Sequence, residues 1–269
     1  MNTLCSLKKI SVVIAVYNGE KFIQKTIDSL KKQTYKNFEV ILIDGSSTDK
    51  TMEIVYSNKE LFVEIISEKD KGMYDAINKG FSHASGSIFC YINSDDLLKE
   101  YTLYEVAHTF SRTNADLVFG DVEYIDEKGK FIYSMKGTKL SKRGVSYIKR
   151  VPFAQQSSFW TKELFIEIGG FDASLKYVAD SKFLLIAYLL PKVKTKYLPM
   201  TLSCFRFHND SFSVGSSQLM HAESAKMRGS LIAILKSNKL LKIYFEFFTK
   251  IKNIKGICAR IAYKGPKLK

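Results

Sequence analysis

The sequence has few cysteines, and they form no motif. The four cysteines stand at positions 5, 90, 204 and 258, and no C-x-x-C pair exists. This spacing argues against a zinc ribbon and against a thioredoxin-like redox centre. We therefore expect free thiols in a reducing cytosol.

Long hydrophobic runs are absent as well. The longest apolar run covers residues 183–190, whereas a membrane-spanning helix needs about 20 apolar residues. The N-terminal part carries Lys8 and Lys9 and then passes directly into a strand-like segment. It has no signal-peptide core and no small-residue cleavage site. The sequence therefore predicts a cytoplasmic protein.

Acidic residues are almost missing from the last part of the chain. The formal net charge is +14, and residues 226–269 contain 12 Lys and Arg against a single acid, Glu246. The first 225 residues hold 29 basic and 26 acidic residues, so they are nearly neutral. This distribution indicates a local anionic partner and not a basic globular surface. Nucleic acid is not expected, because the neutral part carries no RNA- or DNA-binding motif.

Apolar, β-branched segments alternate with helical patterns between residues 10 and 92. Strands are predicted at residues 10–16, 38–43, 62–66 and 87–92, and helical patterns follow the first three of them. This alternation is typical of a doubly wound α/β sheet. Such sheets bind ligands at the carboxyl ends of their strands, and this sequence has polar residues there: Tyr17, Asn18, Asp44, Asp95 and Asp96.

The second half of the sequence has a less regular pattern. A hairpin is predicted for residues 116–135, with its turn at 126–129. A helix at 163–168 is expected to end at Gly169 and Gly170, as a C-cap would. Another helix is predicted at 178–190, before Pro191, followed by one or two strands at 196–207 and two basic helices at 218–255.

Eight stretches of the sequence match, in order, those of a known family. They are SVVIAVYNGE (11–20), FEVILIDGSSTDKT (38–51), DKGMYDAINKG (70–80), YINSDD (91–96), FGDVEYID (119–126), PFAQQSSFW (152–160), IGGFDASLKYVADSKFLL (168–185) and FRFHNDSFS (205–213). Through them the chain resembles the family 2 glycosyltransferases, especially bacterial members that build O-antigen and other surface polysaccharides. The resemblance implies an inverting enzyme with the α/β GT-A fold, a Rossmann-like, mostly parallel sheet with flanking helices.

Other nucleotide enzymes with a similar sheet are disfavoured. No G-x-G-x-x-G follows the first predicted strand, which argues against a dinucleotide oxidoreductase. The same place lacks a glycine- and lysine-rich phosphate loop, which weakens a nucleotidylyltransferase. A non-catalytic, membrane-associated protein that binds a glycan or a nucleotide sugar, derived from a transferase, stays open as the alternative.

The resemblance assigns four residues to the nucleoside of a UDP-sugar donor. Asp44 would accept a hydrogen bond from the uracil imide N–H, since an ionised carboxylate only accepts. Tyr17 would stack on the base, Ala15 would offer backbone contacts, and Asp70 would orient the base or the ribose. Without these roles, Asp44 would cap a helix and Tyr17 would simply pack. The family often has Asp-Asp-Gly-Ser where residues 44–47 are Asp-Gly-Ser-Ser, so the second aspartate has no counterpart.

The resemblance places the metal and the donor sugar after the fourth strand. Asn93-Ser94-Asp95 occupies the position of the family's D-x-D motif. Asp95 is therefore expected to bind Mn²⁺ or Mg²⁺, hard ions that prefer oxygen ligands, and Asn93 to bond a ribose hydroxyl. Gln156 would bond donor-sugar hydroxyls, and His208 would be a further metal ligand, as a histidine is in some GT-A enzymes. The alternatives are a plain strand-terminal turn and an ordinary histidine.

Asp180 matches the family's catalytic base. It is predicted at the N-terminus of a helix, where the helix dipole favours the ionised carboxylate. Such a group takes the proton of the acceptor hydroxyl while the oxygen attacks the anomeric carbon. The alternative is an N-cap without chemistry. The family often has a second acid two residues later, where this chain has Lys182.

The basic tail interleaves Lys and Arg with Leu, Ile and Phe. A basic amphipathic helix lies well on an anionic leaflet, which suits a lipid-linked saccharide acceptor at the inner face of the cell membrane. The alternative is helices that pack on the domain with solvated lysines. We expect two parts, a GT-A domain at 1–215 and a basic helical extension at 216–269. Together they would move a hexose (galactose, glucose or an N-acetyl form) from a UDP-sugar to a growing surface glycan.

Overall fold

The first half of the molecule has the predicted alternation of strands and helices. The computed structural model describes residues 7–209, 211, 217–231, 250 and 253–263. All four predicted strands are confirmed, with boundaries that differ by one residue at most. The elements are β1 (Ile10–Val16), α1 (Ile23–Lys31), β2 (Phe38–Asp44), α2 (Thr51–Tyr56), the 3-10 helix η1 (Lys59–Leu61), β3 (Phe62–Ser67), α3 (Met73–Ser82) and β4 (Ile88–Asn93).

The second half follows the predicted pattern in part, since the strand at 97–98 and the helices at 102–113 and 142–148 were not predicted. The hairpin is confirmed, because β6 (Leu117–Ile125) and β7 (Phe131–Met135) pair antiparallel. The helix before Gly169 ends there, with a φ of 85° at this glycine, the left-handed conformation of a C-cap. The elements are β5 (Leu97–Leu98), α4 (Thr102–Thr113), β6 (Leu117–Ile125), β7 (Phe131–Met135), α5 (Lys142–Ile148), η2 (Gln155–Ser157), β8 (Ser158–Thr161), α6 (Lys162–Ile168), α7 (Ala179–Leu189), β9 (Thr195–Arg206), α9 (Ser217–Leu231) and α11 (Ile254–Ala262).

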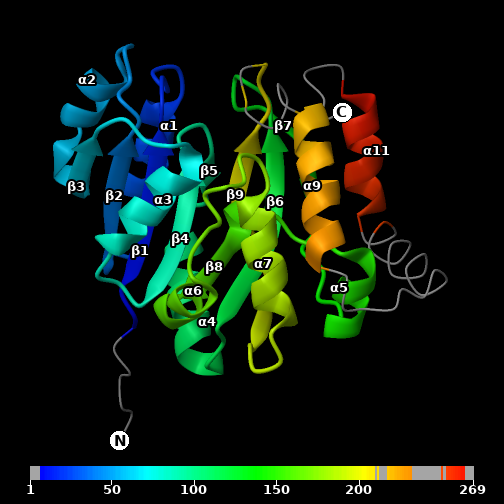
Figure 1. Ribbon diagram of the computed structural model, residues 1–269. Coiled ribbons are helices and arrows are strands. Elements are labelled where there is room, and N and C mark those ends of the chain that lie inside the picture. The colour runs from blue at the N-terminus through cyan, green and yellow to red at the C-terminus, as the bar shows by residue number, and fades with distance from the viewer. Residues whose placement is uncertain (1–6, 210, 212–216, 232–249, 251–252, 264–269) are drawn as a thin grey trace, which may run out of the picture.

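The strands of the described residues form one curled sheet. Its order is β3-β2-β1-β4-β8-β6-β9-β5, with β7 attached to β6. The pairs among β3, β2, β1 and β4 are parallel, so their carboxyl ends meet at the upper edge in Figure 1. In this register Ala15 lies between Ile43 and Asn93, and Val16 lies beside Asp44. The polar residues that follow β1, β2 and β4 are thus neighbours.

Both faces of the sheet are covered, which explains the continuous apolar runs of its strands. On β1, Val13 belongs to a core with Ile77 of α3 and Phe183 of α7. Ile14 faces the opposite core, with Ile27 of α1 and Val106 of α4. In Figure 1, α3 and α7 lie in front of the sheet. The helices therefore form the two outer layers of an α/β fold.

In the C-terminal extension, α11 packs against β7 of the sheet. In Figure 1, α9 and α11 stand side by side near β7. Asn253, just before α11, accepts the Lys136 N–H and donates its amide to the Lys136 carbonyl. The Tyr263 ring lies 6.0 Å from the Phe207 ring. Residues 232–249 of the predicted basic extension lie outside the described residues.

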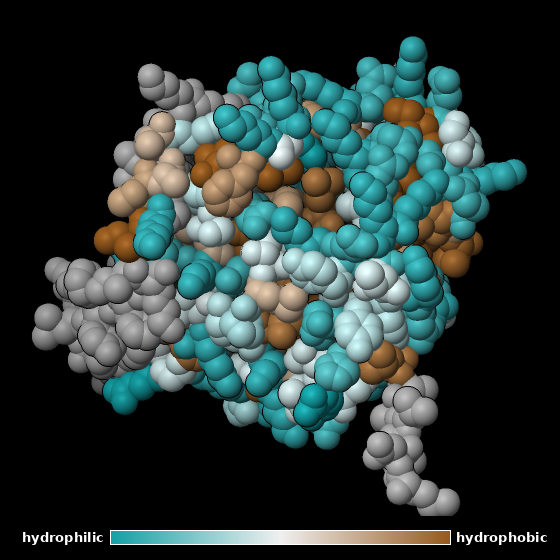
Figure 2. Space-filling model, turned by 180° about the vertical axis from the view of Figure 1, so that it is seen from behind, coloured by the Kyte–Doolittle hydropathy of each residue, from teal (hydrophilic) through white to brown (hydrophobic). Residues whose placement is uncertain are grey.

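The surface seen from behind is largely hydrophilic, with apolar side chains in scattered patches (Figure 2). Phe131, Tyr101 and Tyr104 are among the large apolar residues that are exposed. None of the described helices is long and apolar enough to cross a bilayer.

Candidate active site at the carboxyl edge of the sheet

The loops after β1 and β2 are joined by reciprocal hydrogen bonds. Asn18 adopts a φ of 51°, a conformation that asparagine tolerates better than most residues. Its N–H donates to Ser47 Oγ at 2.8 Å, and its Oδ1 accepts the Thr48 N–H at 2.9 Å. These contacts hold both loops in one arrangement. They leave the Tyr17 side chain 64% exposed, where it can stack on a planar ring.

Asp44 ends β2 and has no exposed surface. Its carboxylate accepts the Ser47 N–H at 3.1 Å, and the hydroxyls of Ser47 and Ser67 at 2.5 and 2.6 Å. The carboxylate thereby joins the ends of β2 and β3. Three donors thus already bond the Asp44 carboxylate, and two of them are hydroxyls, which are able to rotate away from a competing donor.

Asp70 lies beside Gly45, on the same edge of the sheet. A Cβ at Gly45 would be 2.8 Å from Asp70 Oδ2 and 3.6 Å from Tyr17 Cβ. The absence of a side chain at Gly45, where the family often has its second aspartate, thus lets Asp70 come close to β2. Asp70 Oδ1 accepts the Gly72 N–H at 2.8 Å, and Gly72 has a φ of 127° with open space around it.

The predicted metal ligands meet beyond the end of β4. Asp95 Oδ2 and His208 Nε2 are 2.8 Å apart, and the side chains are 23% and 7% exposed. The Nδ1 atom of His208 is buried without a hydrogen-bond partner. Among the described residues, no cluster of three or more His, Cys, Asp or Glu side chains is placed to hold a metal. Within the described part of the chain, Asp95 and His208 are thus the predicted metal ligands that lie in direct contact.

Asp96 is the buried centre of a hydrogen-bond network next to this pair. It accepts the Arg206 N–H and the Asn93 amide, both at 3.0 Å, and a bond from the Gln156 side chain. Burial raises the pKa of Asp96 well above its usual range, and the neighbouring Asp95 charge adds to this. Asn93 and Gln156, for which the family resemblance implied bonds to the ribose and the donor sugar, both bond Asp96 here.

Arg206 was not predicted, and it is 1% exposed. Its Nε donates to the Asp95 carbonyl at 2.9 Å, and its guanidinium lies 5.1 Å from the centre of the Phe22 ring. The same Phe22 ring is 4.5 Å from the His208 ring. Arg206 therefore fixes the backbone of the proposed metal ligand. An arginine between Phe205 and Phe207 in an otherwise apolar strand is the feature of the sequence that could have indicated a buried, functional arginine.

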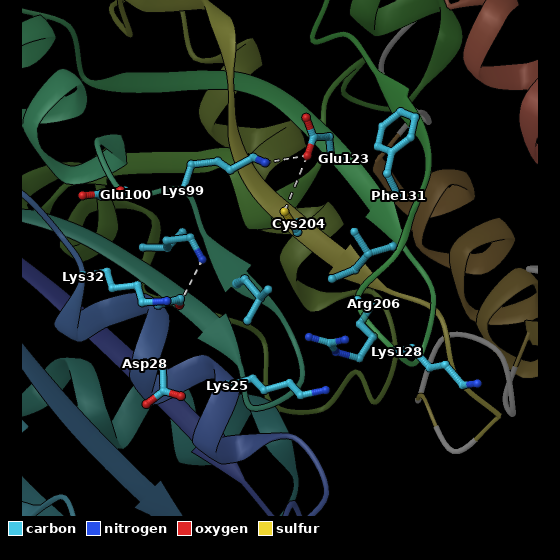
Figure 3. A pocket seen from close by; sticks show the side chains of 15 residues that line it. Lys25, Asp28, Lys32, Lys99, Glu100, Glu123, Lys128, Phe131, Cys204 and Arg206 are labelled. Atoms are coloured by element: carbon cyan, nitrogen blue, oxygen red, sulfur yellow. Dashed lines mark hydrogen bonds and ion pairs between the residues drawn. The ribbon is translucent and has the colours of Figure 1, made fainter.

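A cavity of about 570 Å³ opens behind Arg206. Figure 3 shows Lys25, Lys128 and Arg206 around one end of it, while Lys99 pairs with Glu123 at 2.6 Å. Its lining comes from α1, the segment around β5, β6, β7 and β9. The predicted nucleoside residues are not part of this lining. Arg206 thus lines the cavity and also bonds the Asp95 carbonyl, so it lies between the two.

Asp180 lies in the first turn of α7, where two tyrosines reach it. Tyr74 donates its hydroxyl to Asp180 Oδ1 at 3.0 Å, and Tyr91 to Oδ2 at 3.5 Å. Burial raises the pKa of Asp180, although the N–H of Ser181 and both hydroxyls oppose this. Desolvation is therefore the largest influence on the pKa of this carboxylate. A general base is most effective when its pKa lies near the working pH, so a raised pKa makes a carboxylate a better base at neutral pH.

Lys182 replaces the second acid of the family and has a partner of its own. Its Nζ lies 2.6 Å from Asp172 Oδ2, and both side chains are about one-third exposed, at 31% and 32%. Lys182 and Ser174 hold the pKa of Asp172 at about 2. The position two residues after Asp180 therefore serves the loop before α7.

The structure brings the predicted residues together in three places on one edge. The nucleoside candidates gather around Gly45, the metal and sugar candidates after β4, and the base candidate beside Tyr91, two residues before Asn93. The first set is Ala15, Tyr17, Asp44 and Asp70, and the second is Asn93, Asp95, Gln156 and His208. Neither tyrosine next to Asp180 was predicted.

Comparison with known proteins identifies the family. The model of glycosyl transferase family 2 matches residues 11–181. The chain belongs to this family. One relative, a PGL/p-HBAD biosynthesis glycosyltransferase of Mycobacterium bovis, is 28% identical over 208 residues, which are 72% of this chain and 75% of the relative. The protein is a glycosyltransferase.

Solved structures support the GT-A fold. TarS 1–349 of S. aureus, in complex with UDP-GlcNAc, matches with a TM-score of 0.68 at 18% identity, over 92% of this chain and 73% of that one. The chain spans 43% of another TarS structure. The mannosyltransferase PcManGT from Pyrobaculum calidifontis, in complex with GDP-Man and Mn²⁺, matches with a TM-score of 0.64 at 17% identity, over 96% of this chain and 75% of that one.

Proposed function

We propose that this glycosyltransferase is an inverting, metal-dependent hexosyltransferase. It moves galactose, glucose or an N-acetyl form from a UDP-sugar to a lipid-linked glycan of a surface polysaccharide such as O-antigen or capsule. The observation that carries the proposal is the arrangement around β4. A carboxylate–imidazole pair follows this strand, and a desolvated carboxylate, Asp180, lies beside Tyr91 within it.

The donor nucleoside is proposed to occupy the loops after β1 and β2. The exposed ring of Tyr17 stacks on the base, the Ala15 backbone and Asp70 flank it, and Asp44 accepts the imide N–H. The joined loops support this, because a site that is already ordered loses little entropy on binding. A structural neighbour crystallised with UDP-GlcNAc supports the choice of UDP.

A divalent ion fits the Asp95–His208 pair. Asp95 Oδ2 and His208 Nε2 lie 2.8 Å apart and would be the two protein ligands of such an ion. Carboxylate and imidazole both suit Mn²⁺. When bound, such an ion offsets the negative charge that builds on the departing diphosphate. A neighbour with Mn²⁺ supports this assignment.

Asp180 is proposed to act as the general base. The acceptor hydroxyl oxygen forms a bond to the anomeric carbon on the face opposite UDP, and its proton passes to the Asp180 carboxylate. The bond from the anomeric carbon to the β-phosphate oxygen breaks, and its electron pair leaves with UDP. Attack from the opposite face inverts the anomeric centre. Tyr74 and Tyr91 hold the carboxylate in place.

The acceptor is proposed to lie at the inner face of the cell membrane. The charge of residues 226–269 supports this, since each basic residue near an anionic surface contributes about 1 kcal/mol. The protein is expected to float with phosphatidylglycerol vesicles and to remain behind with phosphatidylcholine vesicles. Equal behaviour with both would remove the membrane from the proposal.

The decisive experiment is UDP release from a panel of UDP-sugars, with and without Mn²⁺ and with simple alkyl glycosides as acceptors. One donor should be turned over, and only with metal. Asp95→Ala should abolish turnover. Asp180→Asn should lower glycoside-dependent release about 100-fold or more while UDP still binds. If no donor is turned over under any condition, the proposed reaction is wrong.

A further inference from the structure

A carboxylate from the C-terminal extension holds the segment before Asp180. Glu223 of α9 accepts three successive backbone N–H groups: from Lys176 at 2.9 Å, Tyr177 at 2.7 Å and Val178 at 3.1 Å. Successive N–H groups that point at one anion form a strong binding site. Val178 is the N-cap of α7 and offers no side-chain cap of its own. Glu223 therefore supplies from another helix the side-chain cap that Val178 cannot provide.

The same segment is held from its other side by Tyr74. The Tyr74 hydroxyl lies 3.3 Å from the Tyr177 carbonyl oxygen and 3.0 Å from Asp180 Oδ1. Tyr177 is therefore held on both sides: its N–H is bonded by Glu223, and its carbonyl faces Tyr74, which also bonds Asp180. Burial raises the pKa of Tyr74 most, and the charges of Asp180 and Glu223 add to this.

We propose that Glu223 is a positioning residue for the catalytic base Asp180, so that the extension completes the active site. The inference rests on the proposed function, in which Asp180 is the base. The family match ends at residue 181, and Glu223 lies in the extension that follows it. Charge-assisted hydrogen bonds are short and strong, and Glu223 is only partly exposed. Loss of three such bonds leaves Asp180 on a loosened first turn.

The test compares Glu223→Ala and Glu223→Gln with Lys226→Ala, an exposed position on the same helix. Three quantities are measured in the full-length protein: amide hydrogen exchange at residues 176–178, affinity for UDP with Mn²⁺, and glycoside-dependent UDP release. Glu223→Ala should speed exchange at these amides at least tenfold. It should leave UDP affinity within about twofold and lower kcat by about 10- to 100-fold, the scale of a misplaced catalytic group.

The glutamine variant keeps the result interpretable if the alanine variant folds poorly. A carboxamide retains one acceptor oxygen and turns an N–H₂ donor toward the amides, so its exchange and kcat should fall between wild type and alanine. Unchanged exchange in both Glu223 variants would overturn the inference, as would faster exchange with an unchanged kcat. A parallel loss of UDP affinity and kcat would also overturn it, since that indicates general loosening. If the wild type releases no UDP, the proposed function falls and takes this inference with it.

Discussion

The pKa of the Asp180 carboxylate is determined by burial and by a few neighbouring donors. Burial raises its pKa above the ordinary value of 3.8, while Ser181, Tyr74 and Tyr91 favour the ionised form. A base is active only when ionised, so the rate should fall as the pH drops through this raised pKa. The acid limb of the pH–rate profile should therefore lie above the range of a solvated aspartate.

Tyr74→Phe should move this acid limb further toward higher pH. The substitution removes a donor that stabilises the ionised carboxylate, so the pKa rises and the rate is lost earlier on acidification. The pH dependence of glycoside-dependent UDP release measures the shift. Tyr197→Phe is the matched control, because it also removes a tyrosine–carboxylate bond, to Asp121 at 2.8 Å. An acid limb that moves equally in both variants, or in neither, would contradict the assignment.

Mn²⁺ should raise the affinity for UDP in the wild type. In His208→Ala this gain in affinity should be smaller by about 10-fold or more, because one of the two proposed protein ligands is lost. Calorimetric titration of UDP at several Mn²⁺ concentrations measures this. His83→Ala is the control, since His83 pairs with Glu64 and lies outside the site. If Mn²⁺ supports UDP binding equally well in His208→Ala, the histidine is not a ligand.

At the scale of elements, the ion pair of Lys182 and Asp172 ties α7 to the loop before it. Lys182→Glu restores the acid that the family often has there, but it brings a like charge to Asp172. We expect a loss of about 1 kcal/mol in the free energy of unfolding, the scale of a partly exposed pair, and no gain in transfer.

Urea denaturation and UDP release test this prediction, with Lys192→Glu as the control. Lys192 also pairs with a carboxylate, that of Glu167, at 3.0 Å. Faster transfer by Lys182→Glu would show that position 182 faces the acceptor.

The strands and helices could be predicted because their signals are local. The run at β1 is apolar on both faces, and Gly169 marks a helix end whatever surrounds it. The polar strand ends could be placed on one edge, because the carboxyl ends of parallel strands meet. The tail differs, since its pattern fits equally well a helix on a membrane and a helix on the domain.

The partners of the site residues could not be predicted from the sequence. Glu223 and the amides at 176–178 are brought together only by the tertiary fold, and nothing in either segment indicates the other. The same holds for Arg206 and the Asp95 carbonyl. The direction of the pKa shift at Asp180 depends on its burial, which the sequence alone does not show.

At the scale of the whole molecule, Glu39 ties the amino ends of the strands together, opposite the active site. It is 5% exposed and bonds Ser11, Ser85 and Lys9. Although burial opposes ionisation, hydrogen bonds from these residues lower its pKa from 4.5 to about 2. Its contribution to stability is therefore complete above the unfolded value and is lost as the pH falls from about 4.5 toward 2.

Glu39→Gln should lower the free energy of unfolding at pH 7 by up to about 3 kcal/mol. The difference from wild type should shrink as the pH falls through this window, because the wild-type carboxylate becomes protonated. Urea denaturation at pH 7 and near pH 3 measures both values. Glu60→Gln, at an exposed pair with Lys31, is the control and should change stability little. A difference that does not depend on pH would contradict the role of ionisation.

The amide of Asn253 occupies both backbone groups of Lys136, directly after β7. A neighbouring strand would use the same donor and acceptor, and β7 pairs on its other side with β6. Uncovered strands of this kind are where identical molecules join edge to edge into aggregates. We therefore expect Asn253 to hinder self-association by keeping these two backbone groups occupied. Solutions of the Asn253→Ala variant should therefore scatter more light than wild type as the protein concentration rises, at a temperature where both proteins stay folded.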